Sequence, residues 1–411
     1  MSNRRTFMEQ CAKGAVGVAV SGLVSSRRVM GANDRVRFGL IGCGSRGKEI
    51  FQAAMRCSNA EAVAAADLYG RRLDEVKALA PSIKTYKDFR QLLDDKSVDA
   101  VLIATPQHQH ALNFVPAIQA GKDVYQEKTM AFSPDHAKRM RKALDGSGRV
   151  VQIGIQMISG PGIKMVREHV TPERMGVITA IHTHHYRNAP YGGWMREIPS
   201  DCDADHIDWS AFQGEGAPHA FDPQRYVNWR FFWDYSGGNV FENMVHQVGY
   251  WHTVLNLKIP HAVTMTGANF LSPKMDPPDV MDVTMHHPTE KLLFTWNSMF
   301  SNNYFGEGHD LLLGTKGTIV HDETDRPRYV PQGKGAVLSE ASTGTTGEYA
   351  EATDAHMQNF FDCVRSRKEP NCPFEIGFRS AIACQMAVRS YREGRTVTWD
   401  EKTEEIVPTH L

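Results

Sequence analysis

The chain has 411 residues, of which 41% are hydrophobic, and its 46 lysine and arginine residues balance 47 aspartate and glutamate residues. This near-average composition excludes a disordered, collagen-like or coiled-coil protein. The formal net charge of −1 offers no basic surface for nucleic acid. No apolar run reaches the roughly 18–20 residues of a membrane-spanning helix. We therefore expect a folded protein of about two or three domains, with no nucleic-acid partner and no membrane insertion after processing.

Residues 1–32 have the order of a twin-arginine export signal. Arg4 and Arg5 precede an Ala/Gly/Val-rich segment at 12–24, and a second arginine pair follows it. The alternative is an unprocessed basic tail. An exported chain would be periplasmic or otherwise outside the cytoplasm, and twin-arginine substrates cross the membrane already folded. The six cysteines beyond this segment form no Cys-x-x-Cys pair, so scattered buried thiols are favoured over a Cys363–Cys372 bridge.

Strand-like and helix-like segments alternate over residues 33–158. This alternation predicts βαβ units on a parallel sheet, which is a doubly wound α/β Rossmann domain. The expected strands are 36–41, 61–66, 100–104 and 123–126, and the expected helices are 48–55, 88–93, 111–120 and 134–144.

The first strand leads into a glycine-rich turn that has the context of a dinucleotide-binding fingerprint. Gly42 permits the tight turn, Gly44 lets the backbone approach a pyrophosphate, and Gly47 lets the helix pack close to the strand. The helix N-terminus would face the phosphates. The turn also places Cys43, Ser45 and Arg46 among the expected cofactor contacts.

Asp67, 20 residues after Gly47, would accept hydrogen bonds from the ribose hydroxyls of the adenosine. Its negative charge would repel a 2′-phosphate, so the sequence favours NAD over NADP. Arg71 and Arg72 lie close by in the sequence and oppose that preference.

Two further motifs end strands at the edge where open α/β sheets bind ligands. They are Thr105-Pro106-Gln107-His108-Gln109-His110 and Gln126-Glu127-Lys128. Together with the glycine turn, these motifs resemble those of the glucose–fructose oxidoreductase/inositol dehydrogenase (Gfo/Idh/MocA) family. The resemblance covers nearly the whole chain beyond residue 32. The cofactor contacts that it implies are Thr105, Pro106, His108, His110, Glu127, Lys128 and Gln156.

The resemblance also implies a second, α+β domain at residues 159–411, with an open and mostly antiparallel sheet. Segments 177–186, 262–268, 282–287, 291–298 and 318–321 look like its strands, and 354–367 and 375–393 look like its last helices. The segment from Gly237-Gly238 to His246 is similar to the family's catalytic helix.

In this family a lysine and a histidine flank the substrate carbon that loses hydride. The resemblance therefore implies that Lys128 binds the substrate hydroxyl and that His246 shares its proton as general acid/base. Glu242, one helical turn before His246, stands at the family's aspartate position and would orient the hydroxyl. The expected substrate contacts are Lys128, His185, Tyr186, Trp229 and His246.

The chain departs from the family pattern at two positions. Thr129 replaces the proline after Lys128, which predicts that a cis-proline turn is not available there. Gly249 stands where many of these dehydrogenases have an aspartate, three residues after His246.

Histidines at 182 and 184 would share one face of a strand, and zinc is the metal that two imidazoles would favour. His286 and His287 are candidates for further ligands on another strand. No third ligand has motif spacing, so we predict no metal site.

The sequence thus predicts an NAD-dependent oxidoreductase that acts on a sugar or polyol, with a cofactor bound tightly and recycled within each cycle. The alternative is an NAD-dependent glycosidase similar to the α-N-acetylgalactosaminidases, which oxidise, eliminate and reduce again with no net redox change. A non-enzymatic sugar sensor is a third interpretation. The partner is a small carbohydrate, and the resemblance implies a homo-oligomer.

Overall fold

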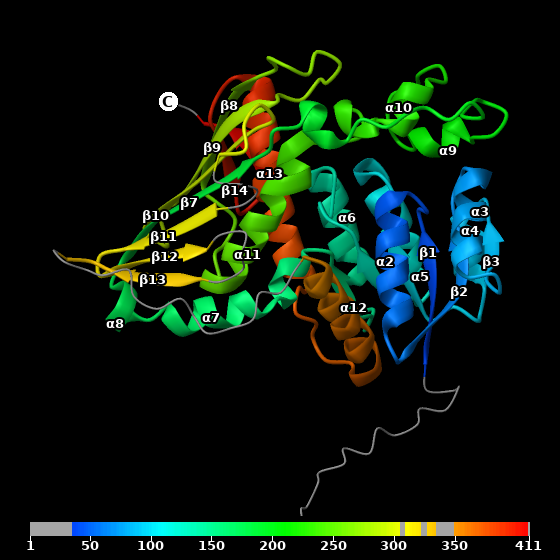
Figure 1. The fold of residues 1–411 in the computed structure, drawn as a ribbon, viewed down its shortest axis with the longest axis horizontal. Coiled ribbons are helices and arrows are strands. Elements are labelled where there is room, and N and C mark those ends of the chain that lie inside the picture. Colours follow the sequence, from blue (N-terminus) through cyan, green and yellow to red (C-terminus); the bar gives the residue numbers. More distant parts are fainter. Residues whose placement is uncertain (1–34, 305–308, 322–326, 334–348, 410–411) are drawn as a thin grey trace, which may run out of the picture. The chain divides into compact units, whose positions relative to one another are not determined.

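The first sheet has six strands in the order β3-β2-β1-β4-β5-β6. All of them are parallel, as the alternation of segments predicts, and β1, β2 and β3 are labelled in Figure 1. The chain starts at the centre, winds to one edge and then to the other, which is the doubly wound arrangement. Its strands are β1 (Val36–Ile41), β2 (Ala60–Ala66), β3 (Lys84–Tyr86), β4 (Ala100–Ile103), β5 (Asp123–Gln126) and β6 (Val151–Ile153), and its helices are α2 (Ser45–Arg56), α3 (Gly70–Leu79), α4 (Phe89–Asp94), α5 (His110–Gln119) and α6 (Pro134–Leu144).

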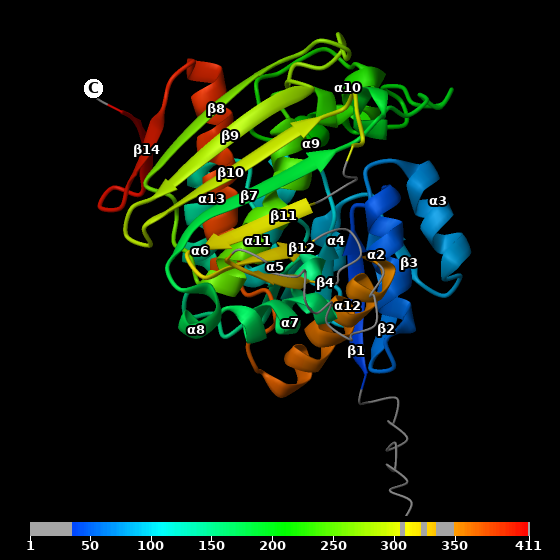
Figure 2. The ribbon, with the colours of Figure 1, turned by 60° about the vertical axis from the view of Figure 1, so that its left-hand side comes forward.

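The second sheet has nine strands in the order β13-β12-β11-β7-β10-β9-β8-β14-β15 (Figure 2). Every ladder in it is antiparallel except the β7–β10 pair, which is parallel. The expected open, mostly antiparallel sheet is therefore confirmed. Its strands are β7 (Ile178–Tyr186), β8 (Ala262–Ala268), β9 (Val280–His287), β10 (Leu292–Met299), β11 (His309–Gly314), β12 (Gly317–His321), β13 (Arg328–Pro331), β14 (Val397–Asp400) and β15 (Glu405–Pro408).

Only one face of this sheet is apolar. Along β9, Met281, Val283 and Met285 are buried, whereas the alternate side chains of Asp282 and Thr284 are exposed. The buried face packs against helices α11 and α13, which share one hydrophobic core with it. The helices of this half are α7 (Pro161–His169), α8 (Pro172–Met175), α9 (Trp209–Gln213), α10 (Pro223–Val227), α11 (Val245–Leu255), α12 (Tyr349–Ser366) and α13 (Phe374–Glu393).

Helix α12 returns from the second half of the sequence to cover the first sheet. The Phe361 ring lies 5.4 Å from the Phe38 ring of β1, centroid to centroid. The Asn59 amide donates to Asp362 at 2.8 Å. Phe360 also belongs to the core cluster around β1 and α2. Residues 35–411 form one compact unit, so the domain boundary expected at residue 158 stays a prediction.

The computed structural model describes residues 35–304, 309–321, 327–333 and 349–409. The export signal expected at residues 1–32 lies outside them. The six cysteines in the described residues are free and buried, and Cys363 and Cys372 are among them. No helix in the described ranges is long and apolar enough to cross a membrane.

Candidate active site

The glycine turn has the geometry that a dinucleotide requires. Gly42 has φ +93°, and a Cβ there would meet the backbone of residues 104 and 105 at 2.8 Å. A Cβ on Gly47 would lie 1.9 Å from the Gly42 oxygen, so any side chain would push α2 away from the turn. At Gly44, by contrast, the nearest atom to a Cβ is 4.0 Å away, which leaves the backbone open to a ligand. No side chain caps α2, and no acid lies in its first turn, so its N–H groups suit a pyrophosphate.

Asp67 lies directly beside this turn. Its carboxylate accepts hydrogen bonds from the backbone N–H groups of Cys43, at 2.7 Å, and Tyr69, at 2.9 Å. The side chain is 5% exposed, and it lines the same cleft as the glycines. The carboxylate is therefore fixed at the end of β2, where a ribose would bind.

A cleft of about 1410 Å³ runs from the glycine turn to the segment before α11. Its volume is ample for a dinucleotide together with a small substrate. Twelve of the residues predicted from the sequence line it, from both halves of the chain. They are Gly42, Cys43, Gly44, Ser45, Arg46, Asp67, Thr105, Pro106, Lys128, Trp229, Glu242 and His246.

Other predicted cofactor contacts lie behind the cleft wall. The His108 ring bonds the Phe212 oxygen at 2.6 Å, and His110 bridges the carbonyls of Thr129 and Thr105. Both side chains are buried, and burial lowers the pKa of each ring to about 4. They brace the wall as neutral rings, so direct contact with a cofactor stays a prediction.

Four further residues were predicted to contact the cofactor or the substrate, and their contacts are likewise untested. Glu127 is 3% exposed and accepts from the Arg46 guanidinium at 2.8 Å, and Gln156 is fully buried. Tyr186 stacks on His184 with ring centroids 4.5 Å apart. His185 does not line the cleft, although its charge lowers the pKa of His246. Their predicted roles as cofactor or substrate contacts stay predictions.

The three predicted catalytic side chains meet at one end of the cleft. The Lys128 Nζ donates to a carboxylate oxygen of Glu242 at 2.7 Å and to its backbone oxygen at 2.9 Å. Glu242 lies in a π-helical turn, Val240–Met244, that continues into α11, and His246 is in the first turn of α11. Lys128 enters from the end of β5. The first half of the chain thus supplies the cation, and the second half supplies the carboxylate and the imidazole.

Electrostatics give these groups distinct protonation states. Burial by itself would raise the pKa of Glu242, but the charges of Arg230 and Lys128 outweigh it and lower the pKa to about 2. Burial lowers the pKa of His246 well below its usual value, and the positive charges of Lys128 and Arg46 lower it further. Near neutral pH the site therefore holds an ionised carboxylate and a neutral imidazole that can accept a proton.

Two residues of this network escaped the sequence analysis. The Gln107 amide donates to Glu242 at 2.7 Å, and Gln107 is 1% exposed. The Arg230 Nε lies 3.3 Å from the same carboxylate oxygen, and its guanidinium stacks over Trp229. Gln107 stands inside the quoted Thr-Pro motif, and Arg230 directly follows a predicted substrate contact. Their positions beside predicted site residues were therefore the only sequence signals that could have pointed to them.

The two departures from the family pattern have local explanations. No cis-proline turn was expected after Lys128, and the Lys128–Thr129 peptide bond is nevertheless cis, without a proline. The Thr129 hydroxyl donates to the Phe241 oxygen at 2.7 Å, so this side chain ties the lysine segment to the glutamate segment. A Cβ on Gly249 would lie 2.6 Å from Ile155, so the space an aspartate would need is filled by the core.

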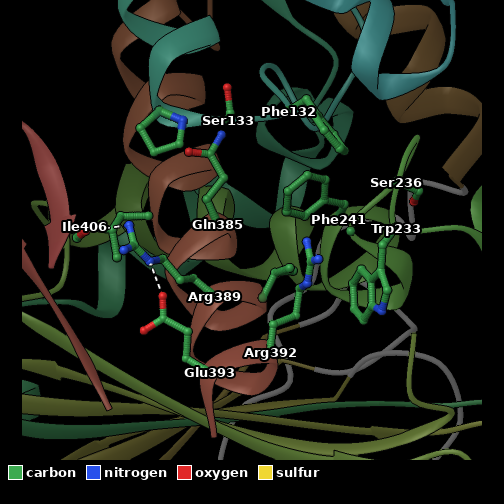
Figure 3. A pocket seen from close by; sticks show the side chains of 13 residues that line it. Phe132, Ser133, Trp233, Ser236, Phe241, Gln385, Arg389, Arg392, Glu393 and Ile406 are labelled. Carbon is green, nitrogen blue, oxygen red and sulfur yellow. Dashed lines mark hydrogen bonds and ion pairs between the residues drawn. The ribbon is translucent and has the colours of Figure 1, made fainter. Parts of the chain in front are cut away.

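A second, smaller hollow of about 480 Å³ lies between α6, α13 and the segment before α11 (Figure 3). Phe132 and Phe241 form part of its wall, and Arg389 is ion-paired with Glu393 at its rim. None of the residues predicted from the sequence lines it. The candidate active site is therefore the larger cleft.

The histidine-rich strand β7 does not gather metal ligands. No group of three potential His, Cys, Asp or Glu ligands occurs in the part of the chain that the structure describes. The His182 ring instead bonds the Thr295 hydroxyl at 2.7 Å, and His184 stacks on His309.

Comparisons with known proteins place both halves of the chain in one family. Residues 36–155 match the oxidoreductase family with an NAD-binding Rossmann fold (GFO_IDH_MocA), and residues 214–399 match the C-terminal alpha/beta domain of the same family. Inositol 2-dehydrogenase of Salmonella typhimurium is 22% identical over 374 residues, which cover 88% of this chain and 96% of that protein. The 2,7-anhydro-N-acetylneuraminate hydratase of Escherichia coli is 25% identical over 291 residues, covering 70% of this chain and 68% of that protein.

A solved structure of similar fold is levoglucosan dehydrogenase in complex with NADH and levoglucosan. It superposes with a TM-score of 0.68 and 17% sequence identity, over 89% of this chain and 99% of that chain. At this identity the likeness establishes the fold, a Rossmann domain joined to a mostly antiparallel sheet.

Proposed function

The chain belongs to the Gfo/Idh/MocA oxidoreductase family, and we propose that it oxidises a sugar or polyol by hydride transfer to NAD. One observation carries the proposal. The Lys128–Glu242 ion pair and the neutral His246 line the same cleft as an open glycine turn. Two similar proteins, inositol 2-dehydrogenase and levoglucosan dehydrogenase, are named for a polyol and an anhydrosugar, which supports this substrate class.

The residues of the chain divide the reaction between them. NAD, held by the glycine turn and Asp67, would supply the hydride acceptor. The Lys128 ammonium would donate a hydrogen bond to the reacting oxygen and stabilise negative charge as it develops there. The neutral His246 would take the hydroxyl proton, so that the hydride leaves for the cofactor and the proton stays on the imidazole. Glu242 holds the Lys128 ammonium in place from the other side.

We further propose that the protein is exported through the twin-arginine pathway and carries its cofactor with it. Arg4 and Arg5 and the apolar segment behind them support this proposal. A compartment outside the cytoplasm holds no free nicotinamide pool, so each oxidation has to be reversed within the cycle, by a second substrate or by the product itself. Replacing both arginines with lysine should leave the full-length chain in the cytoplasm, as cell fractionation would report.

A redox-neutral reaction is the second candidate. The Escherichia coli relative is named a hydratase, and hydration involves no net oxidation. In this chain the same reasoning gives a glycosidase, in which transient oxidation of the sugar permits elimination of the aglycone, and water addition and reduction follow. The site residues are the same in both cases, and only the fate of the oxidised intermediate differs.

We further propose that the protein forms a homo-oligomer, as the resemblance to the family implies, through the exposed face of the second sheet that carries Asp282 and Thr284. Light scattering of the purified protein tests this directly. A monomer at all concentrations would refute it.

The experiment that separates the functions uses protein purified without added cofactor. Released NAD(H) is quantified after denaturation, and the native protein is incubated with free sugars, polyols and nitrophenyl glycosides. Bound NAD that becomes NADH with a free sugar, and is reoxidised by a second carbonyl compound, supports the oxidoreductase. Aglycone release with no net NADH supports the glycosidase. Protein that neither contains nor binds NAD would refute both.

A further inference from the structure

One long connection of the second half reaches across to the first sheet. This crossing segment, residues 187–236, contains α9 and α10, which Figure 1 shows over the end of the first sheet. Ile207 forms a β-bridge with Tyr69, and the Gln109 amide donates to the Phe212 oxygen at 2.5 Å. Arg139 forms an ion pair with Glu215. The crossing segment is therefore fixed to the first sheet at several points around the cleft.

A further contact of the crossing segment lies beside Asp67, where the adenosine of the cofactor would bind. Asp201 of the crossing segment accepts from the Arg71 Nε at 2.9 Å and from the Tyr69 hydroxyl at 2.5 Å. The Arg71 Nη2 lies 2.7 Å from the same carboxylate. These bonds hold the pKa of Asp201 at about 2, so the carboxylate is ionised near neutral pH. Arg71 is only four residues beyond Asp67, and both line the cleft.

The other arginine near Asp67 is also engaged. The Arg72 guanidinium lies 4.9 Å from the centroid of the Tyr226 ring and 4.0 Å from the Asp67 carboxylate. Tyr226 is buried, and its edge packs against Tyr69. Arg72 is thus held between the crossing segment and β2.

In Rossmann domains, an arginine just after the second strand accommodates the 2′-phosphate of NADP, whereas an acid there binds the free ribose hydroxyls of NAD. This chain carries both residue types. We propose that Asp201 sets the cofactor preference: by binding Arg71, it withdraws the cation that a 2′-phosphate would need and leaves Asp67 to select NAD. Asp201 is therefore a positioning residue that acts through Arg71, and the inference rests on the proposed function only in that NAD is the cofactor.

The test replaces Asp201 with Asn, which removes the charge but keeps a side chain of similar shape. The purified protein is first freed of its bound nucleotide and then dialysed against equimolar NAD and NADP, and the bound nucleotides are extracted and quantified. We expect about a 10- to 100-fold rise in bound NADP relative to NAD, because the freed arginine would bond the 2′-phosphate. Asp201→Ser replaces this variant if Asp201→Asn does not fold.

Two matched variants isolate the mechanism. Asp74→Asn removes the same charge from an exposed position on α3, three residues from Arg71, and should leave the wild-type ratio unchanged. The double variant Asp201→Asn with Arg71→Ala should return to the wild-type preference, because the cation that Asp201 released is gone. A merely structural role for Asp201 would lower total bound nucleotide in both variants and would not show this reversal.

An unchanged ratio of bound NADP to bound NAD in the Asp201 variants would overturn the inference. The proposed function would still stand, because the protein would still bind NAD. NADP gain that persists in the double variant would overturn it as well, since another residue would then bind the phosphate. Protein that binds neither nucleotide would refute both this inference and the proposed function.

Discussion

Two buried carboxylates flank helix α11, and their pKa values shift in opposite directions. Glu242, just before the helix, has its pKa lowered to about 2 because the charges of Arg230 and Lys128 outweigh the effect of burial. Asp310 of β11 has its pKa raised to about 6 by burial. Its hydrogen-bond donors are neutral, the Trp251 indole at 2.7 Å and the Gln247 amide, and the charge of His321 offsets only part of the rise in pKa.

The contrast shows what each kind of partner does for a carboxylate out of water. Neutral donors satisfy its hydrogen bonds but only partly offset the cost of burying the charge, whereas cations also supply opposite charge. The catalytic side of α11 therefore keeps fixed charges beside the substrate. On the sheet side, Asp310 joins α11 to β11, and its carboxyl group titrates at about pH 6.

Replacing Lys128 with Met should have the largest effect, because it removes the cation from the catalytic side and makes the surroundings of Glu242 more like those of Asp310. We expect kcat/KM to fall by about 10³-fold, within the range for loss of a donor that stabilises charge on the reacting oxygen, and the pKa of Glu242 to rise. Lys77→Met, which removes the same charge from an exposed position on α3, is the control and should be fully active. A Lys128→Met protein that holds NAD and turns over substrate normally would refute the assigned role.

Replacing Glu242 with Gln should have a smaller effect. The amide keeps the shape but leaves Lys128 and Arg230 without their carboxylate, so we expect kcat/KM to fall by about 10- to 100-fold, or about 1.4–2.7 kcal/mol in barrier. Glu242→Asp, which retains the charge, should recover part of the loss. Steady-state kinetics of both variants check this order, and equal activities would show that the charge is not what matters.

Asp310→Asn should change stability rather than activity. A carboxyl whose pKa is higher in the folded than in the unfolded protein stabilises the fold below the unfolded pKa, and this stability is lost as pH rises to the folded pKa. For a rise from 3.8 to about 6, the loss is about 3 kcal/mol between pH about 4 and 6. Denaturant unfolding at several pH values should show a decline in wild type that is smaller in Asp310→Asn. Asp282→Asn, an exposed change on the same sheet, should follow wild type.

Local signals in the sequence were sufficient for much of the first sheet. The glycine turn and strands β1, β2, β4 and β5 were predicted because their signals are local: apolar runs, terminating glycines and the spacing of βαβ units. The short strands β3 and β6 were missed, and so were β11, β13, β14 and β15 in the second sheet. Each carries little periodicity of its own and is a strand because a neighbour pairs with it.

The site shows the same division. Lys128, Glu242 and His246 were predicted because each stands in a motif of the resembling family, and the structure brings them together. The contacts of Gln107 and Arg230 with Glu242, and of Asp201 with Arg71, were not predicted. Most join residues more than 100 positions apart, and no spacing along one segment encodes such a contact.

The return of α12 to the first sheet bears on how the protein is made. A ribosome releases the six strands of the nucleotide-binding half long before residues 349–366, whose Phe360 and Phe361 rings complete the core around Phe38. Helix α2 covers part of this core through Phe51, but the part that α12 covers stays exposed until then. Synthesis must therefore be almost finished before either half can reach its final state, and a fragment ending near residue 158 should be prone to aggregate.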